Sequence, residues 1–285
     1  MLYSQVMRVG FHVSISGGFE RSVIKARRLG CEALQIFSHS PRSWRLKEIE
    51  NREKEAFIRA SAESGLFPIA VHMPYLPNLA TENKDLYLKS VCVLEQNIAR
   101  ACLLEADFLV LHPGNFGKGT PEKGIRNIAN AINRVLTPET RCRLLLENTA
   151  GQGTEIGHHF FQLKSIVDRI HAKDRIGLCL DTAHAFAAGY DLSTEKGCDR
   201  MLEEIDRLLG IGKLYFLHFN DTRAALGSRS DRHWHIGKGH IGTRGFRHML
   251  NHPAIRKLAG VMETPGKTEN EERCNMKMLR TLMKT

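Results

Sequence analysis

Histidines and carboxylates recur in this sequence directly after short apolar runs, at the places where β-strands are predicted to end. Seven residues share this position: His12, His72, His112, Glu147, Asp181, His218 and Glu263. His184 follows three residues after Asp181, about one turn into the next predicted helix. Imidazole nitrogens and carboxylate oxygens are ligands of zinc and similar first-row divalent ions. A single such residue is usually a hydrogen-bonded rim residue, but the repeated placement predicts a metal site with several ligands.

Further candidate ligands lie in the segment from His218 to Gly242. This segment begins at the end of an apolar run, becomes rich in glycine and charge, and contains Asp231-Arg232-His233. In an extended chain residues i and i+2 point to the same side, so Asp231 and His233 can bind one ion together. Taken alone, the segment is equally consistent with a solvated loop. The carboxylates elsewhere favour the metal interpretation, because burying them side by side without cations costs several kcal/mol each.

The number of ions depends on how these ligands are divided. Glu147, Asp181, His218 and Glu263 suffice for one ion. Five candidates are then left over: His72, His112, His184, Asp231 and His233. Nine ligands suit three ions if one carboxylate bridges two of them. Two ions about 3.5–4 Å apart can activate water for phosphoester hydrolysis, and a third can bind the remaining phosphate oxygen.

The elements that would position these residues are short strands alternating with longer amphipathic segments. The predicted strands are residues 8–13, 33–37, 68–73, 107–112, 143–148, 176–181, 213–220 and 259–263. Helical spacing of apolar residues recurs between them, for example within residues 85–105 and 125–135. Gly30 and Gly65 mark the ends of helices predicted at 21–29 and 47–64, and Thr120-Pro121 marks a helix start.

This alternation predicts an α/β fold, a (β/α)8 or TIM barrel, formed by residues 1–285 as one catalytic domain. A doubly wound open sheet is the competing topology. It would be favoured by a GxGxxG turn after the first strand, and Ser16-Gly17-Gly18 is not one. In a barrel the carboxyl ends of the strands converge on one face, where active sites are built. The candidate ligands are therefore expected to meet there.

The chain is basic, with 41 Lys and Arg against 31 Asp and Glu and a net charge of +10. This balance favours a polyanionic partner, nucleic acid before a membrane surface. No apolar run approaches the roughly 20 residues needed to cross a bilayer. We find no secretory signal and expect a cytoplasmic protein, associated with the nucleoid when bound to DNA. The seven cysteines form no CxxC pair, which favours reduced thiols over disulfides or a thiolate zinc site.

Eight motifs distributed over nearly the whole chain allow a more specific comparison. They are FHVSISGG (11–18), VHMPYLPNL (71–79), LHPG (111–114), LENTAGQG (146–153), LDTAHAFAAGYDL (180–192), HFNDT (218–222), GSRSDRH (227–233) and METP (262–265). Together they resemble the endonuclease IV family of apurinic/apyrimidinic (AP) endonucleases. The resemblance implies a TIM barrel with three zinc ions that repairs DNA at abasic sites.

The resemblance also implies a division of the nine ligands in which Glu147 bridges two ions and is the central catalytic residue. The three groups would be His72, His112 and Glu147; Glu147, Asp181, His218 and Glu263; and His184, Asp231 and His233. Zinc is the expected ion, with manganese or another divalent ion as an alternative at one site. His12 would support a neighbouring ligand or contact phosphate.

Three further residues are implied to contact double-stranded DNA that contains an abasic site. In the family, an arginine and a Tyr-Leu pair at the positions of Arg42, Tyr75 and Leu76 enter the minor groove and hold the helix open at the lesion. Phe37 is expected in the barrel core instead. The implied enzyme is a monomer. Five loop residues depart from the usual family pattern and concern loops and substrate preference rather than the ligands: Pro77, Asn115, Phe116, Lys238 and His240.

The implied reaction is hydrolysis of the phosphodiester 5′ to the abasic site, leaving 3′-hydroxyl and 5′-deoxyribose phosphate ends, together with removal of 3′ blocking groups. The main alternative is a single-metal sugar isomerase or epimerase on the same barrel, which uses a Glu-Asp-His-Glu set. Five surplus ligands and the loops around Arg42 and Tyr75 favour the nuclease. A nonenzymatic lesion-binding protein is a third possibility, but it would be expected to lack a ligand.

Overall fold

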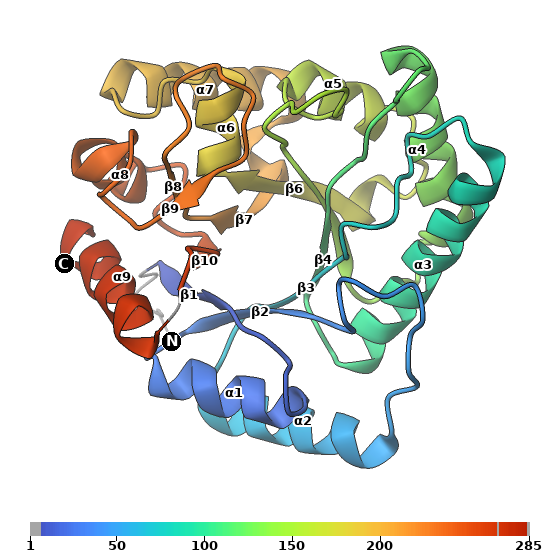
Figure 1. Cartoon of the computed structure of the whole chain (residues 1–285), viewed down its shortest axis with the longest axis horizontal. Coiled ribbons are helices and arrows are strands. Elements are labelled where there is room, and N and C mark those ends of the chain that lie inside the picture. Colours follow the sequence, from blue (N-terminus) through green and yellow to red (C-terminus); the bar gives the residue numbers. More distant parts are fainter. Residues whose placement is uncertain (1–6, 267, 284–285) are drawn as a thin grey trace.

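Eight parallel strands close into a barrel in the computed structural model, which describes residues 7–266 and 268–283 (Figure 1). The strands are β1 (Arg8–His12), β2 (Ala33–Phe37), β3 (Ile69–His72), β4 (Phe108–Leu111), β5 (Arg143–Glu147), β6 (Ile176–Asp181), β7 (Leu214–His218) and β10 (Ala259–Met262). Around the barrel their order is β1-β10-β7-β6-β5-β4-β3-β2. The TIM barrel predicted from the sequence is confirmed.

Helices surround the barrel and cover its outer face (Figure 1). They are α1 (Phe19–Arg28), α2 (Asn51–Ser64), α3 (Lys84–Leu103), α4 (Pro121–Val135), α5 (Phe160–Val167), α6 (Thr182–Ala188), α7 (Glu195–Leu209), α8 (Gly242–Asn251) and α9 (Glu269–Leu282). The predicted signals hold at their ends. The Thr120 hydroxyl accepts a hydrogen bond from Lys123 N at the start of α4, and Gly65 ends α2 with a φ of 64°.

The strands are buried on both faces, which explains why they appear in the sequence as continuous apolar runs rather than alternating ones. Their outward-facing residues pack against the helices in a large core. Their inward-facing residues form a separate cluster within the barrel: Ala33, Ala70, Val110, Leu145, Cys179, Phe216, Ala259 and Val261. This inner cluster supports the functional face above it.

Two local features differ from the sequence prediction. The helix predicted at 47–64 begins only at Asn51, because the preceding segment is tied to α3 instead. The Arg100 guanidinium donates hydrogen bonds to the carbonyl oxygens of Lys47 and of Ser38 earlier in the chain, and so takes up a backbone acceptor of the segment before Asn51. The second feature is an unpredicted two-stranded hairpin, β8 (Asp221–Thr222) with β9 (His233–Trp234).

No helix in the described part of the chain is both long and apolar enough to cross a membrane. The seven cysteines are free thiols in the structure, as predicted. Burial raises the pKa of the Cys179 thiol, inside the barrel, to about 12.

Candidate metal centre

The candidate ligands lie directly above the apolar cluster inside the barrel. His72 follows the inward-facing Ala70 by two residues, and Glu147 follows Leu145 in the same way. Residues two apart on a strand point to the same side, so each ligand continues the inner face of its strand at the carboxyl end. Five of these residues end their strands: His12, His72, Glu147, Asp181 and His218. Two others, His112 and Glu263, lie one residue beyond the ends of their strands.

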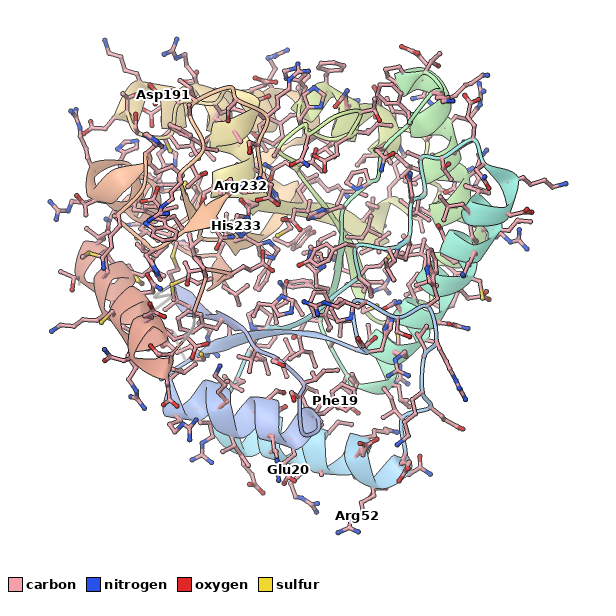
Figure 2. The ribbon with its side chains drawn as sticks, viewed as in Figure 1. Phe19, Glu20, Arg52, Asp191, Arg232 and His233 are labelled. Carbon is pink, nitrogen blue, oxygen red and sulfur yellow. The ribbon has the colours of Figure 1, made fainter. Side chains whose placement is uncertain are left out.

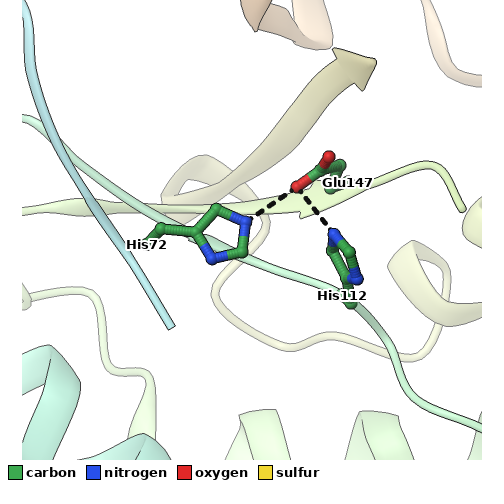
Figure 3. A group of neighbouring side chains, drawn as sticks. All are labelled: His72, His112 and Glu147. Carbon is green, nitrogen blue, oxygen red and sulfur yellow. Dashed lines mark hydrogen bonds and ion pairs between the residues drawn. The ribbon is translucent and has the colours of Figure 1, made fainter. Parts of the chain in front are cut away.

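The first group consists of His72, His112 and Glu147 (Figure 3). Nε2 of His72 lies 3.0 Å from Glu147 Oε2, and Nε2 of His112 lies 3.2 Å from the same oxygen. Glu147 is fully buried and His72 nearly so, whereas His112 reaches the cavity described below. Two imidazole nitrogens thus lie about 3 Å from one carboxylate oxygen, and ligand atoms at this separation from one another can bind the same metal ion.

The second group consists of Glu147, Asp181, His218 and Glu263. Nδ1 of His218 lies 3.0 Å from Glu147 Oε1, 3.4 Å from Glu263 Oε2 and 3.8 Å from Asp181 Oδ2. Glu147 therefore directs its Oε2 towards the first group and its Oε1 towards the second. This is the arrangement expected of a bridging carboxylate.

The third group joins His184, on the first turn of α6, to the hairpin strand β9. His184 Nε2 lies 3.4 Å from His233 Nε2 and 3.4 Å from Asp231 Oδ2, and His233 Nε2 lies 3.3 Å from Asp231 Oδ1. Asp181 also approaches this group, with Oδ2 3.6 Å from His233 Nε2. The structure thus brings together the three residues predicted here and adds Asp181 as a fourth neighbour.

The hairpin explains how His233 reaches the barrel from a long loop. Thr222 pairs with His233 across the two strands. The buried carboxylate of Asp221 accepts hydrogen bonds from the backbone nitrogens of Gly239, Ile241 and Gly242, which fixes the return of the chain. Figure 2 shows His233 inside the ring of helices, in contrast to Arg52 on the outer side of α2.

The hydrogen bonds of two histidines test whether this centre fits metal ions. His72 Nδ1 lies 2.6 Å from the Met73 carbonyl oxygen, and His184 Nδ1 lies 3.0 Å from the Asn148 carbonyl oxygen. A carbonyl oxygen only accepts, so in the neutral ring the proton is on Nδ1 and Nε2 presents its lone pair. In both rings Nε2 faces carboxylate oxygens, which supply no proton. A nitrogen lone pair and a carboxylate repel each other unless a cation lies between them, so this arrangement fits a bound metal ion. Histidines that bind metal commonly donate their other ring N–H to an acceptor such as a backbone carbonyl.

The electrostatics of the centre favour ionised carboxylates. Burial alone would raise the pKa values of Glu147 and Glu263, but His218 beside both lowers each pKa well below its usual value. Burial likewise opposes protonation of His184, yet the carboxylates of Asp181, Asp231 and Glu147 raise its pKa well above the usual value. The carboxylates are thus ready to bind a cation, and cation binding would displace protons from the imidazoles.

A cavity of about 510 Å³ opens beside the first and third groups. Tyr75, Leu76, His112, His184 and Asp231 are among the residues that line it. The Tyr75 side chain is 65% exposed, and its ring centroid lies 6.1 Å from that of His112. A substrate in this cavity would therefore touch both the predicted DNA-contacting pair and the candidate ligands.

The remaining predicted residues lie around this centre. His12 Nδ1 lies 2.9 Å from Glu263 Oε1, and its ring packs 4.3 Å from Phe37, so it supports a candidate ligand. Phe37 is partly buried at the end of β2 and also contacts Tyr75. Arg42 is exposed on the segment that follows β2 and does not line the cavity.

Three amide side chains near the ligands were missed in the sequence. Asn220 donates to Asp181 Oδ2 at 2.7 Å, and its own oxygen accepts from Glu263 N. Asn148 exchanges two hydrogen bonds with the Asp181 backbone. Gln35 contacts both His218 and Glu263. Asn148 and Asn220 follow the ligands Glu147 and His218 by one and two positions, and Gln35 follows the inward-facing Ala33 by two. This spacing is a sequence signal that could have identified them.

The family model described as a xylose isomerase-like TIM barrel matches residues 23–282. The probable endonuclease 4 of Methanoculleus marisnigri is 44% identical over 276 residues, which cover 96% of this chain and 98% of that protein. The corresponding protein of Cenarchaeum symbiosum is also 44% identical, over 97% of this chain and 99% of its own length.

Two solved structures are also similar to this chain. The crystal structure of endonuclease IV from Thermus thermophilus has a TM-score of 0.85 and 35% identity, covering 96% of this chain and 98% of that one. A D-tagatose 3-epimerase-like protein has a TM-score of 0.75 at 18% identity, covering 97% of both chains. The latter likeness shows a shared fold alone.

Proposed function

The chain belongs to the endonuclease IV family, and from this premise we propose that it cleaves double-stranded DNA on the 5′ side of abasic sites. Family membership makes it a nuclease of the hydrolase class with an AP endonuclease role. The proposed products are 3′-hydroxyl and 5′-deoxyribose phosphate ends. Removal of 3′ blocking groups at the same site is part of the proposal. The observation that carries it is the convergence of three ligand groups, joined by Glu147, beside one cavity.

We assign three zinc ions to the nine candidate ligands, with manganese or another divalent ion as an alternative at one site. The assignment is His72, His112 and Glu147 for the first ion; Glu147, Asp181, His218 and Glu263 for the second; and His184, Asp231 and His233 for the third. When bound, such ions would activate water and stabilise the oxygens of the reacting phosphodiester. The fit rests on the inward-facing imidazole lone pairs and on the lowered pKa values of Glu147 and Glu263.

The protein's own residues contribute orientation and exclusion of water. Backbone carbonyls hold the rings of His72 and His184 so that Nε2 faces inwards. Asn220 and the His184 backbone nitrogen occupy the two oxygens of Asp181 and fix its carboxylate. Burial of Glu147 keeps water from competing for its oxygens. Such pre-organisation lowers the cost of assembling the charged centre around a phosphate.

Recognition of the lesion is assigned to the loops beyond the strand ends. Tyr75 and Leu76 are exposed at the cavity, where an apolar pair could enter the space left by a missing base. Arg42, on the exposed segment after β2, would contact the groove or backbone nearby. The net charge of +10 supports binding to the phosphate backbone. We further propose a monomer whose barrel acts as one catalytic domain in the cytoplasm, where it meets nucleoid DNA.

The alternative reaction, single-metal isomerisation or epimerisation of a sugar, would use the second group alone. That group is complete in the structure, so metal count is the discriminating measurement. A sugar isomerase gives no role to the five residues outside it that contact Glu147 or one another: His72, His112, His184, Asp231 and His233.

The direct test uses purified protein and a duplex oligonucleotide with one abasic site. We expect cleavage on the 5′ side with ends that carry 3′-hydroxyl and 5′-deoxyribose phosphate, and about three metal ions per chain by elemental analysis. An intact oligonucleotide, or cleavage on the 3′ side, would contradict the proposal. One ion per chain together with ketose epimerisation would support the sugar enzyme instead.

A further inference from the structure

Gln35 is a fully buried polar residue among the apolar residues of β2. It follows the inward-facing Ala33 by two positions and pairs in register with His12 on β1. Its side chain therefore points into the barrel at the level of the candidate ligands. Among the described residues, the metal-competent groups take no ligand from β2. Gln35 occupies the place where β2 would have supplied one.

The side-chain amide of Gln35 joins two candidate ligands from other strands. Its Nε2 donates to Glu263 Oε1 at 2.8 Å, and its Oε1 lies 2.9 Å from His218 Nε2. The carboxylate of Glu263 only accepts hydrogen bonds, so the amide nitrogen must face it. The amide oxygen must then face His218. The hydrogen bond to Glu263 therefore distinguishes the nitrogen of the Gln35 amide from its oxygen.

The orientation of the amide determines which nitrogen of the neutral His218 ring carries the hydrogen. An amide oxygen only accepts, so the hydrogen between the two residues belongs to His218 Nε2. In the neutral ring Nδ1 then carries the lone pair. Nδ1 is the nitrogen that faces Glu147 Oε1 at 3.0 Å and Glu263 Oε2 at 3.4 Å. The acceptor at Gln35 therefore favours the tautomer whose lone pair faces the carboxylates.

The same amide orients the Glu263 carboxylate. Oε1 of Glu263 receives the Gln35 hydrogen bond and also lies 2.9 Å from His12 Nδ1. That oxygen is occupied on the outer side, which leaves Oε2 to face His218 and the second group. Gln35 thus orients the His218 ring and, together with His12, the Glu263 carboxylate.

We infer that Gln35 is a positioning residue that holds His218 and Glu263 in their metal-binding state. The inference rests on the proposed metal centre and deepens it. Outer partners of metal ligands commonly contribute 10–100-fold to metal affinity. Since Gln35 serves two ligands of one group, its loss should weaken the ion of the second group and spare the other two.

The test compares Gln35→Met and Gln35→Glu with the wild type in zinc competition against a chromophoric chelator. Met has a similar length but neither donates nor accepts, so we expect one of the bound zinc ions to be held about 10–100-fold more weakly. Glu keeps an acceptor towards His218, so Gln35→Glu should retain zinc better than Gln35→Met. Equal zinc affinity in all three proteins would overturn the inference.

A matched control separates metal positioning from a general packing defect. Gln162 is another buried glutamine, on α5, whose side-chain oxygen accepts from Gly157 N at 2.9 Å. Gln162→Met should lower the melting temperature without changing zinc affinity. For Gln35→Met, the stabilisation gained on adding zinc should shrink as well. If both variants lose only zinc-independent stability, Gln35 is a packing residue and the inference is wrong.

The same measurements separate this inference from the proposed function. A wild-type chain that binds no zinc, manganese or similar ion would overturn the metal centre and the role of Gln35 together. A wild type with about three ions and a Gln35→Met variant of unchanged affinity would overturn only the role of Gln35. If Gln35→Met does not fold, Gln35→Ala replaces it, because alanine removes both hydrogen bonds without adding an apolar chain: weaker zinc binding than in the wild type supports the positioning role, and equal binding overturns it.

Discussion

Glu147→Gln is the most informative single change, because the two oxygens of Glu147 serve different groups. Oε2 faces His72 and His112, and Oε1 faces His184 and His218. An amide of the same size has only one oxygen. Whichever way it turns, an NH2 group that cannot bind a metal faces one of the two groups. The other group keeps an oxygen that has lost its negative charge.

The size of the effect follows from this geometry. Loss of an outer partner of a metal ligand typically costs 10–100-fold, and loss of a ligand atom costs at least as much. Glu147 serves two groups, so the two losses compound to roughly 10²–10⁴ in turnover, or about 3–5 kcal/mol of transition-state stabilisation. DNA binding should change little, because Glu147 is fully buried and the exposed loops are untouched.

The assay measures single-turnover cleavage of abasic duplex, metal content and DNA affinity on the same preparations. We expect at least one ion to be lost, with DNA affinity nearly unchanged. Glu204→Gln is the matched control, because Glu204 accepts a hydrogen bond from Tyr190 away from the centre and should leave all three quantities intact. Turnover within about tenfold of the wild type, at full metal content, would refute the bridging role of Glu147.

Three other outcomes follow from the structure. Tyr75→Ala and Arg42→Ala should each reduce the ratio of abasic to intact DNA affinity at fixed salt with zinc content unchanged; an unchanged ratio in both would place lesion recognition elsewhere. Burial, with the charge of Arg100, lowers the pKa of His39 from 6.5 to about 4, so the folded state loses stability as pH falls from 6.5 towards 4. His39→Gln should remove up to about 3 kcal/mol of that loss in denaturant unfolding, and identical pH profiles would contradict it. Stepwise chelation should first remove the ion bound by Asp231, because its side chain is 44% exposed; in Asp231→Asn the most easily chelated ion should already be missing by elemental analysis, and loss of a more tightly held ion instead would contradict this order.

The parts of the site that could be predicted are those that a local sequence pattern determines. Buried parallel strands require continuous apolar runs, so a charged residue at the end of one, such as Asp181 or His218, stands out. The barrel then brings these ends together without further information. His233 was found through its spacing from Asp231, although the hairpin that carries it was not.

The parts that could not be predicted depend on contacts between residues far apart in the chain. Residues 47–50 have helical composition, but Arg100, 53 positions after Lys47, binds the carbonyl of that residue and delays the start of α2. Gln35 within ALQIF looks like an ordinary polar position of a strand. Its importance appears only when His218 and Glu263, which lie 183 and 228 positions later, are seen to contact it.

The three oriented histidines show why one of them needs a side chain as its outer partner. His72 and His184 lie where the chain leaves the barrel, and loop carbonyls of Met73 and Asn148 are free to accept from their outer nitrogens. His218 is completely buried, and its Nε2 faces across the barrel interior towards β2. Carbonyls within a barrel strand are committed to neighbouring strands, so only a side chain can supply an acceptor at that point. Gln35 meets this need, and an apolar residue there would remove the acceptor that faces His218 Nε2.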